Sequence, residues 1–271
     1  MMNRNGYCEV GSGSLYYEAV GTGAPVVFIQ GFGLNLTYWD SQLPAFRSNY
    51  LTMRYDRRGF GHSSEPRQDV PYSDYEDLGR LLDFLGLSEV HLVAECVGSH
   101  VALEFALEYP ERVKSLVLAN PDAGPGIAGV NEAFFKIVED TRPFDAAGDL
   151  RRAFELAFAN PIIAPALHDE DVRFRLTRAF AGFKGWHFLH WYPRRSCDPP
   201  VSERLGEIDM PTLILSGGKD YVYFRRVADM LAESIPNART EALPDSGHFA
   251  CIEFPEQANA IILDFLRSTP A

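Results

Sequence analysis

The residue best suited to chemistry is Cys96, which lies in the segment Ala-Glu-Cys-Val-Gly at positions 94–98. A nucleophile on a sharp turn between a strand and a helix needs small residues two positions away on either side, because larger ones would clash with the strained backbone. Ala94 and Gly98 meet this requirement. The turn would aim the side chain at a helix N-terminus, whose dipole favours an anion, so we expect a lowered thiol pKa at Cys96. The alternative is a buried structural cysteine, the commonest role of a free cysteine.

The elements that would hold this turn alternate between strand and helix patterns. An apolar strand at 90–94 precedes the turn, and a helix at 97–109 follows it and stops before Pro110. Further strands are expected at 14–20, 25–29, 51–55, 115–119, 212–216 and 239–243, and further helices at 72–85, 224–235 and 255–267. Such alternation predicts an α/β fold with a mostly parallel central sheet and helices on both faces.

The pattern changes between about residue 124 and about residue 204, where helical stretches at 131–140, 150–159 and 171–183 have no convincing strand between them. We therefore predict a core domain of residues 1–123 and 205–271 with a helical cap, residues 124–204, inserted in it. Aromatic residues are frequent in this insertion, and most of them must serve its own packing. A share would line an apolar pocket over Cys96, and the candidate substrate-binding residues are Trp39, Trp186 and Trp191.

Five motifs in chain order resemble the α/β-hydrolase family, over nearly the whole chain. They are the turn at 94–98, Gln-Gly-Phe-Gly at 30–33, Asp-Arg-Arg-Gly-Phe-Gly-His-Ser at 56–63, the segment 211–220 ending in Gly-Gly-Lys-Asp, and Asp-Ser-Gly-His at 245–248. Two positions depart from the family pattern. The usual serine is Cys96, as in dienelactone hydrolases and polyhydroxyalkanoate synthases, and the usual histidine of the oxyanion turn is Gln30. An alternative explanation for Cys96 is that a native serine was replaced by cysteine in order to trap a complex.

The resemblance implies a catalytic triad in the family's order of nucleophile, acid and histidine, here Cys96, Asp220 and His248. His248 would take the proton of Cys96 and later give a proton to the leaving group. Asp220 would orient His248 and stabilise the imidazolium. Asp122, which follows the strand at 115–119, is the alternative acid, since some family members use that position.

The resemblance also places the oxyanion hole at two backbone N–H groups, those of Phe32 and Val97. Glu95, directly before the nucleophile, would either oppose thiolate formation or hydrogen-bond into the fold. We favour the structural role, because the family tolerates many residues at this position. The loop at 57–61 is interpreted as a support for the fold, since it lacks the spacing of a phosphate-binding loop.

Composition limits the other classes of function. The charge sum of 25 − 37 = −12 and the lack of any basic run longer than a pair argue against nucleic-acid binding. The four cysteines are far apart and form no Cys-x-x-Cys pair, so we expect a reducing cytoplasm rather than a disulfide scaffold. No apolar segment is long enough to span a membrane. No acidic or histidine cluster has metal-ligand spacing, and we expect neither a metal nor a cofactor.

The predicted function is hydrolysis of an ester, thioester or lactone carbonyl through a covalent acyl-enzyme. The substrate would be a small molecule with an apolar or aromatic acyl part, with a CoA or carrier-protein partner left open. An acyltransferase or cyclase would use the same acyl-enzyme with a different acceptor. A carbon–carbon lyase using His248 as base, or a ligand receptor without catalysis, is the alternative from another class on this fold.

Overall fold

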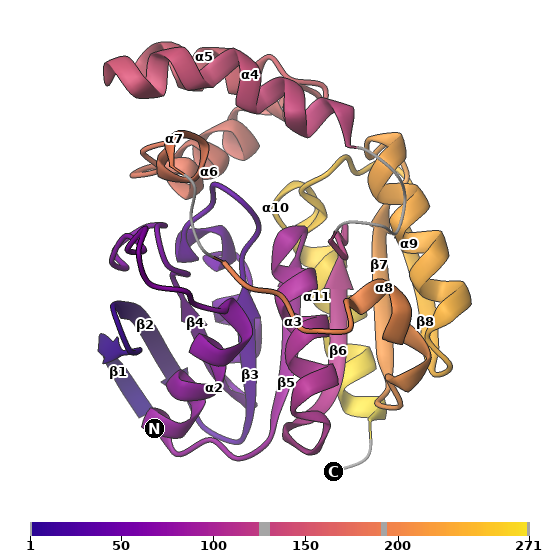
Figure 1. Ribbon diagram of the computed structural model, residues 1–271. Coiled ribbons are helices and arrows are strands. Elements are labelled where there is room, and N and C mark those ends of the chain that lie inside the picture. Colours follow the sequence, from indigo (N-terminus) through magenta and orange to yellow (C-terminus); the bar gives the residue numbers. More distant parts are fainter. Residues whose placement is uncertain (1, 125–130, 191–193, 270–271) are drawn as a thin grey trace.

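The computed structural model describes residues 2–124, 131–190 and 194–269, which are built around an eight-stranded sheet (Figure 1). The strand order is β1-β2-β4-β3-β5-β6-β7-β8. The pairs β1–β2 and β2–β4 are antiparallel, and the other neighbours are parallel. The strands are β1 (Met2–Glu9), β2 (Ser14–Gly21), β3 (Ala24–Ile29), β4 (Tyr50–Tyr55), β5 (Val90–Glu95), β6 (Val113–Ala119), β7 (Thr212–Gly217) and β8 (Ala238–Leu243). The predicted fold class is confirmed.

The sequence patterns did not predict β1, and its place at the sheet edge explains why. It pairs with β2 alone, from Met2 opposite Gly21 to Glu9 opposite Ser14. An edge strand contributes few side chains to the core, so its residues need not form an apolar run. Arg4, Asn5, Tyr7 and Glu9 are accordingly exposed, and Cys8 is the buried residue among the described side chains of β1.

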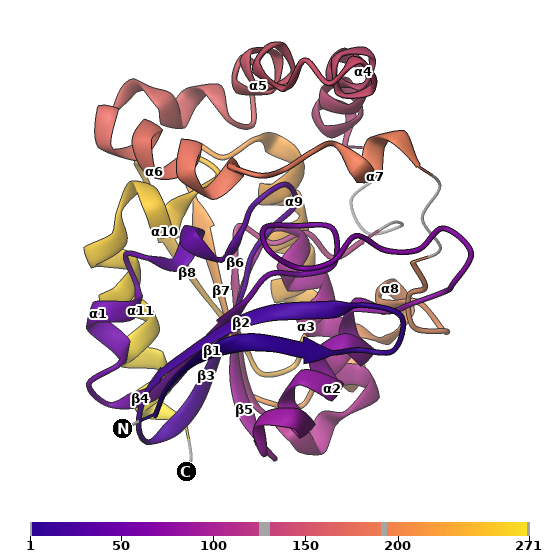
Figure 2. The ribbon, with the colours of Figure 1, turned by 90° about the vertical axis from the view of Figure 1, so that its left-hand side faces the viewer.

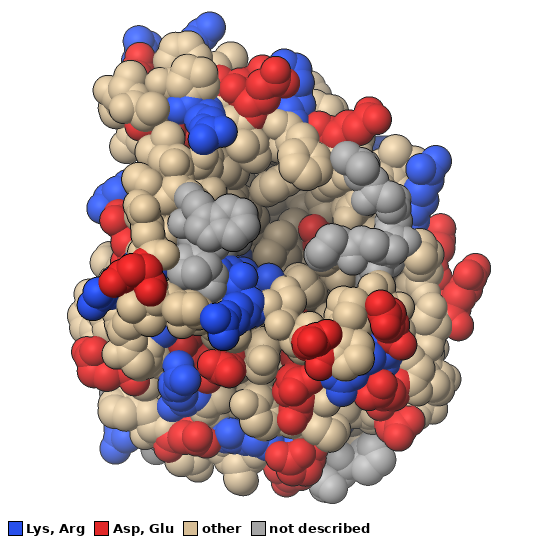
Figure 3. Space-filling view, in the orientation of Figure 1, with Lys and Arg blue, Asp and Glu red and all other residues tan. Residues whose placement is uncertain are grey.

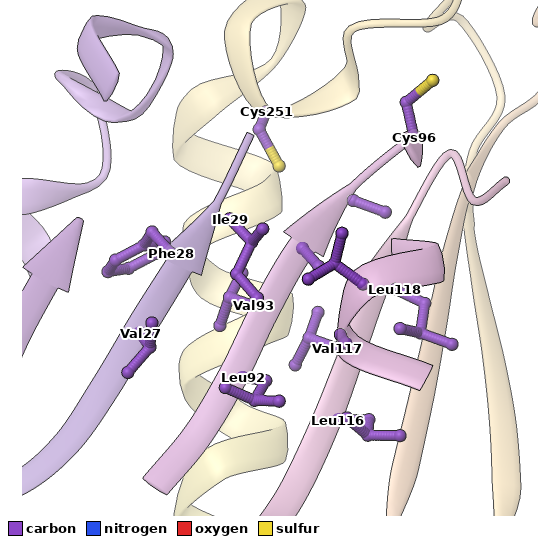
Figure 4. Close-up of a cluster of buried hydrophobic side chains, with 14 of the residues drawn as sticks. Val27, Phe28, Ile29, Leu92, Val93, Cys96, Leu116, Val117, Leu118 and Cys251 are labelled. Atoms are coloured by element: carbon purple, nitrogen blue, oxygen red, sulfur yellow. The ribbon is translucent and has the colours of Figure 1, made fainter. Parts of the chain in front are cut away.

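Helices cover both faces of the sheet (Figure 2). The helices α2 (Asp74–Leu85) and α3 (Val97–Glu108) lie on one face, and α1 (Leu43–Phe46) and α11 (Pro255–Ser268) lie on the other. The remaining core helices are α8 (Val201–Arg204), α9 (Val222–Ser234) and α10 (Ala250–Glu253). Because helices pack on both sides, the central strands are apolar along their length. Figure 4 shows this core around Val27, Leu92 and Val117, each fully buried.

Four helices lie above the carboxyl ends of the parallel strands (Figures 1 and 2): α4 (Glu132–Ala147), α5 (Leu150–Phe158), α6 (Glu170–Phe180) and α7 (Trp186–Leu189). The helix α4 continues past the predicted end at residue 140, through Pro143, and stops at Gly148 in the left-handed region. The α6 end is tied to the core by Asn35, whose Nδ2 donates to the carbonyls of Arg178 and Ala181. In the part of the chain described, no helix combines the length and apolar character that crossing a membrane requires.

Candidate active site

Cys96 occupies a sharp turn between β5 and α3, as the sequence predicts. Its backbone has φ 49° and ψ −122°, a conformation that non-glycine residues seldom adopt. The turn brings Gly98 so close to the carbonyls of Ile29 and Gln30 that no Cβ would fit there. Cys96 is 8% exposed and lines a pocket beneath the helices α4, α5, α6 and α7.

His248 is held beside Cys96 by a buried carboxylate. Its Nδ1 lies 3.0 Å from both carboxylate oxygens of Asp220, and both residues are buried. Asp220 also accepts hydrogen bonds from the backbone N–H of Tyr221 at 2.6 Å and from Nδ2 of Asn120 at 2.8 Å. These contacts fix the imidazole so that Nδ1 serves Asp220, which leaves Nε2 for the nucleophile side.

Asn120 was not singled out in the sequence, where it marks the turn at the end of β6. Besides Asp220, its Nδ2 donates to the carbonyl of Gly247, and its Oδ1 accepts from the N–H of Ala250. It thus connects the acid to the loop that carries His248. Asn120 is buried at φ 44°, and the only signal in the sequence is an asparagine at the end of a strand, a residue type that tolerates this conformation.

Asp122, the alternative acid, has other partners. Its Oδ1 accepts from the N–H of Gly124 at 2.9 Å and from the hydroxyl of Tyr223 at 3.4 Å. Asp220, rather than Asp122, has its carboxylate within hydrogen-bond distance of Nδ1 of His248.

Glu95 lies inside the same group of side chains. One carboxylate oxygen of Glu95, Sγ of Cys96 and a ring nitrogen of His248 all lie within 4.8 Å of one another. Oε1 of Glu95 is 3.6 Å from Nε2 of His248, and the carboxylate also lies against Gly31. Neither carboxylate oxygen has a hydrogen-bond partner among the described residues. The buried carboxyl of Glu95 therefore lies beside both Cys96 and His248.

The three titratable groups have strongly shifted pKa values. Burial raises the pKa of Cys96 to about 11, although His248 partly offsets it. Burial also raises the pKa of Glu95 to about 8. Burial lowers the pKa of His248, but the charges of Asp220 and Cys96 outweigh it and hold that pKa well above its usual range.

The expected lowering of the Cys96 pKa was wrong, because burial raises this pKa and the charges of Glu95 and Asp122 raise it further. Burial therefore favours the protonated thiol. Attack on a substrate requires His248 in its neutral form, so that the thiol proton passes to Nε2 as the bond to Sγ forms.

Arg57 holds the turn after β3, where the sequence predicts one donor of an oxyanion hole. One guanidinium N–H donates to the carbonyl of Gly31 at 3.0 Å. In a trans peptide the carbonyl and the next N–H point in opposite directions, so this bond turns the N–H of Phe32 away from Arg57. Phe32 lines the pocket, and Val97 is the first residue of α3, where the backbone N–H has no partner within the helix.

Arg57 belongs to a buried ionic network that joins the loop after β4 to α2, α3 and Arg194. It lies 3.5 Å from Asp74, and Asp74 also accepts from Nε of Arg194 at 2.7 Å. Arg194 is in turn 2.7 Å from Glu104 on α3. Burial opposes the ionised form of Asp74, but Arg57 and Arg194 outweigh it and lower its pKa. The loop at 57–61 therefore supports the fold, as interpreted from the sequence.

The pocket beneath the cap is apolar. It encloses about 780 Å³ of space not filled by protein atoms, part of which is open to solvent. Figure 3 shows the face of the molecule hollowed below α4 and α5. Phenylalanines from both layers form its walls: Phe32, Phe134, Phe154, Phe180, Phe183, Phe188, Phe224 and Phe249. The polar side chains in its described lining are Glu95, Cys96, Thr141, Asp145 and His248.

Two of the three tryptophans expected to bind substrate, Trp39 and Trp186, are not among the described residues that line this pocket. Trp39 is fully buried in the core, where its ring lies 5.1 Å from Phe28 and 4.8 Å from Tyr38. Trp186 packs against His187 and His190 within the cap. Trp191 lies outside the described residues. A short helical turn at Leu36–Trp39 directs Trp39 inward, and phenylalanines line the pocket instead.

The same central group is the candidate site for a metal ion. Glu95, Cys96 and His248 each offer one ligand atom, which the sequence spacing did not predict because the residues come from two distant segments. A thiolate, an imidazole and a carboxylate are ligands that zinc accepts. The raised pKa values of Cys96 and Glu95 oppose the deprotonation that such binding requires.

Comparison with known proteins agrees with this geometry. A family model described as the alpha/beta hydrolase family matches residues 26–261. The chain is 29% identical to the poly(3-hydroxyalkanoate) depolymerase of Ectopseudomonas oleovorans over 90% of this chain and 84% of that protein. Among solved structures, a hydrolase from Pseudomonas aeruginosa PA01 is 27% identical with a TM-score of 0.69, covering 97% of this chain and 98% of the other. The esterase RhEst1 from Rhodococcus sp. ECU1013 shares the fold with a TM-score of 0.80 at 22% identity, over 100% of both chains. From its motifs, its topology and this match, the chain belongs to the alpha/beta hydrolase family.

Proposed function

We propose that this protein hydrolyses an ester, thioester or lactone of a largely apolar acyl group, with Cys96 as nucleophile, His248 as general base and acid, and Asp220 as its orienting carboxylate. The observation that carries the proposal is the buried His248, bonded through Nδ1 to Asp220 and placed beside the thiol of Cys96. Nucleophile, base and orienting group in this order are the requirements of covalent acyl transfer.

The reaction begins with attack of Sγ of Cys96 on the substrate carbonyl, while the thiol proton passes to Nε2 of His248. The carbonyl oxygen becomes an oxyanion, which the backbone N–H groups of Phe32 and Val97 stabilise. Collapse of this intermediate breaks the bond to the leaving group, which takes the proton from His248. Water activated by His248 then attacks the thioester, releases the acid and returns the proton to Cys96.

The pocket supports an apolar acyl group, because phenylalanine and aliphatic side chains form most of its lining. The names of the relatives are consistent with this class of reaction, since they include an esterase and a depolymerase of poly(3-hydroxyalkanoate). A cyclase or acyltransferase would share the first step and replace water by another acceptor.

The test is hydrolysis of a series of p-nitrophenyl and thioester acyl substrates by the purified protein and by Cys96→Ala, in the presence of a metal chelator. We expect turnover by the wild type and at least a thousandfold loss in Cys96→Ala, with unchanged Tm. Retention of most of the activity by the alanine variant would contradict a covalent mechanism.

The acid is tested by two matched variants. We expect Asp220→Asn to lower kcat by on the order of 10³ to 10⁴, because a misoriented imidazole loses most of its effect. Asp122→Asn, which removes a buried carboxylate without contact to Nδ1 of His248, should cost less than tenfold. The reverse order would move the acid to Asp122.

A further inference from the structure

The pocket has a second polar end, away from the nucleophile. Thr141 and Asp145 line it from α4, which lies in the layer above the strands. They are 2% and 8% exposed, so both are more than nine-tenths buried. Thr141 Oγ1 and Asp145 Oδ2 have no hydrogen-bond partner among the described residues.

The two residues continue a stripe along α4 that faces the pocket. Phe134, Ile137, Thr141 and Asp145 all line it and are spaced by three, four and four residues, which places them on one side of a helix. At its start, the ring of Phe134 lies 5.2 Å from the ring of Phe32 in the oxyanion turn. Asp145 is eleven residues further on, roughly 16 Å along the axis at 1.5 Å per residue.

The far end of the stripe is defined by the start of α7. The carboxylate of Asp145 lies against Gly185, at a distance that leaves no room for a Cβ on that residue. The ring of Phe188, whose N–H donates to the carbonyl of Gly185, stacks on Phe32 with centroids 5.2 Å apart. Aromatic rings therefore separate the Thr141–Asp145 pair from the oxyanion turn.

Among the described residues, no basic side chain forms an ion pair with the carboxylate of Asp145. Burial raises the pKa of Asp145, and the neighbouring hydroxyl of Thr141 lowers it in part. The neighbouring lining from α5 is apolar, with Leu150, Ala153 and Phe154. A buried acceptor without a partner is costly, and a ligand that supplies a donor removes that cost.

We propose that Thr141 and Asp145 form a subsite that binds a hydrogen-bond donor, such as a hydroxyl group, at the far end of the acyl chain. The substrate would then be an apolar acyl group that carries its reacting carbonyl at one end and a donor at the other. This inference names the substrate class of the proposed hydrolase and rests on that function.

The experiment compares p-nitrophenyl esters with ω-hydroxyacyl and methyl-terminated chains of equal heavy-atom count, over a range of lengths. For the wild type, the ratio of kcat/KM between the hydroxy and the methyl series should rise above one at the length that reaches α4. A hydrogen bond to a charged group is worth a gain of about tenfold or more. In Asp145→Leu this gain should disappear, and in Thr141→Val it should shrink at the same length.

The matched control is Glu139→Leu, which makes the same kind of change on an exposed position of α4 and should keep the wild-type ratio. Asp145→Leu should have a Tm no lower than the wild type, since it removes an unpartnered buried carboxyl. A ratio that never exceeds one in the wild type, or that is equal in Asp145→Leu, would overturn the subsite.

Binding of the corresponding primary amides, measured by calorimetry, keeps this test separate from catalysis. If the wild type hydrolyses no ester, the proposed function fails. Tighter binding of the ω-hydroxy amide to the wild type than to Asp145→Leu would still support the subsite, and equal binding would overturn it.

Discussion

At the scale of single residues, the site combines three titratable side chains, those of Cys96, His248 and Glu95. The sequence motifs identify the first two. Glu95 is fully buried beside Cys96 and His248, and its carboxyl has no hydrogen-bond partner among the described residues. With a pKa of about 8, it is neutral at pH 7. A neutral carboxyl does not repel the oxyanion that forms nearby, whereas an ionised one would.

Ionisation of Glu95 should therefore lower the activity of the enzyme at alkaline pH. We expect kcat/KM of the wild type to fall above about pH 8, where Glu95 ionises, and Glu95→Gln to lack this fall while keeping activity at pH 7 within about tenfold. The exposed Glu241→Gln should keep the wild-type profile. An unchanged alkaline limb in Glu95→Gln would show that another group causes it.

The same group affects stability. The unfolded chain loses this proton near the ordinary carboxyl pKa, but the folded protein keeps it to about pH 8. Between these values the folded state binds more protons, so the contribution of Glu95 to the free energy of unfolding falls as pH rises. Denaturant titrations should find Glu95→Gln stabilised relative to the wild type more at pH 8 than at pH 5. An equal difference at both values would contradict the raised pKa.

At the scale of elements, the site depends on three loops that follow strands. The turn after β5 carries Cys96, the turn after β3 carries Phe32, and the loop after β8 carries His248. Carboxyl ends of parallel strands meet at one edge of the sheet, so these loops converge without a long connection. Arg57, in the loop after β4, holds the second of them through the carbonyl of Gly31.

Arg57→Met should therefore impair catalysis beyond its effect on stability. We expect kcat to fall by on the order of 10- to 100-fold with little change in KM, since loss of one oxyanion donor costs about 10² to 10³. Arg58→Met is the matched control, because Arg58 is an equally buried arginine paired with Asp77 and does not touch the oxyanion turn. It should lower Tm but leave kcat of the folded protein within about threefold. Equal kcat in both variants would mean that Arg57 acts on stability alone.

At the scale of the whole molecule, most of the sheet and the turn that carries Cys96 could be predicted from the sequence, because each depends on local patterns. Apolar runs of five or six residues give the central strands, and small residues around Cys96 give the turn. The placement of Asp220 next to His248 could be inferred only from the resemblance to a family, since 28 residues separate them.

Properties that depend on residues far apart in the sequence could not be predicted. The pKa of Cys96 depends on how completely the surrounding residues exclude water and on the charges of His248 and Glu95 beside it. The inward position of Trp39 depends on its packing against Phe28. The pair Thr141 and Asp145 lies beyond the helix predicted at 131–140, whereas α4 continues to Ala147.

The central claim is that Cys96 carries the acyl group. The most direct measurement is intact-mass spectrometry of the protein quenched in acid during turnover of an acyl p-nitrophenyl ester, followed by peptide mapping. We predict a mass increase of one acyl group, located on the peptide that contains Cys96, chased away on further incubation and missing in Cys96→Ala. Steady turnover with no adduct on Cys96, in the wild type or in a slowed Asp220→Asn variant, would contradict the account.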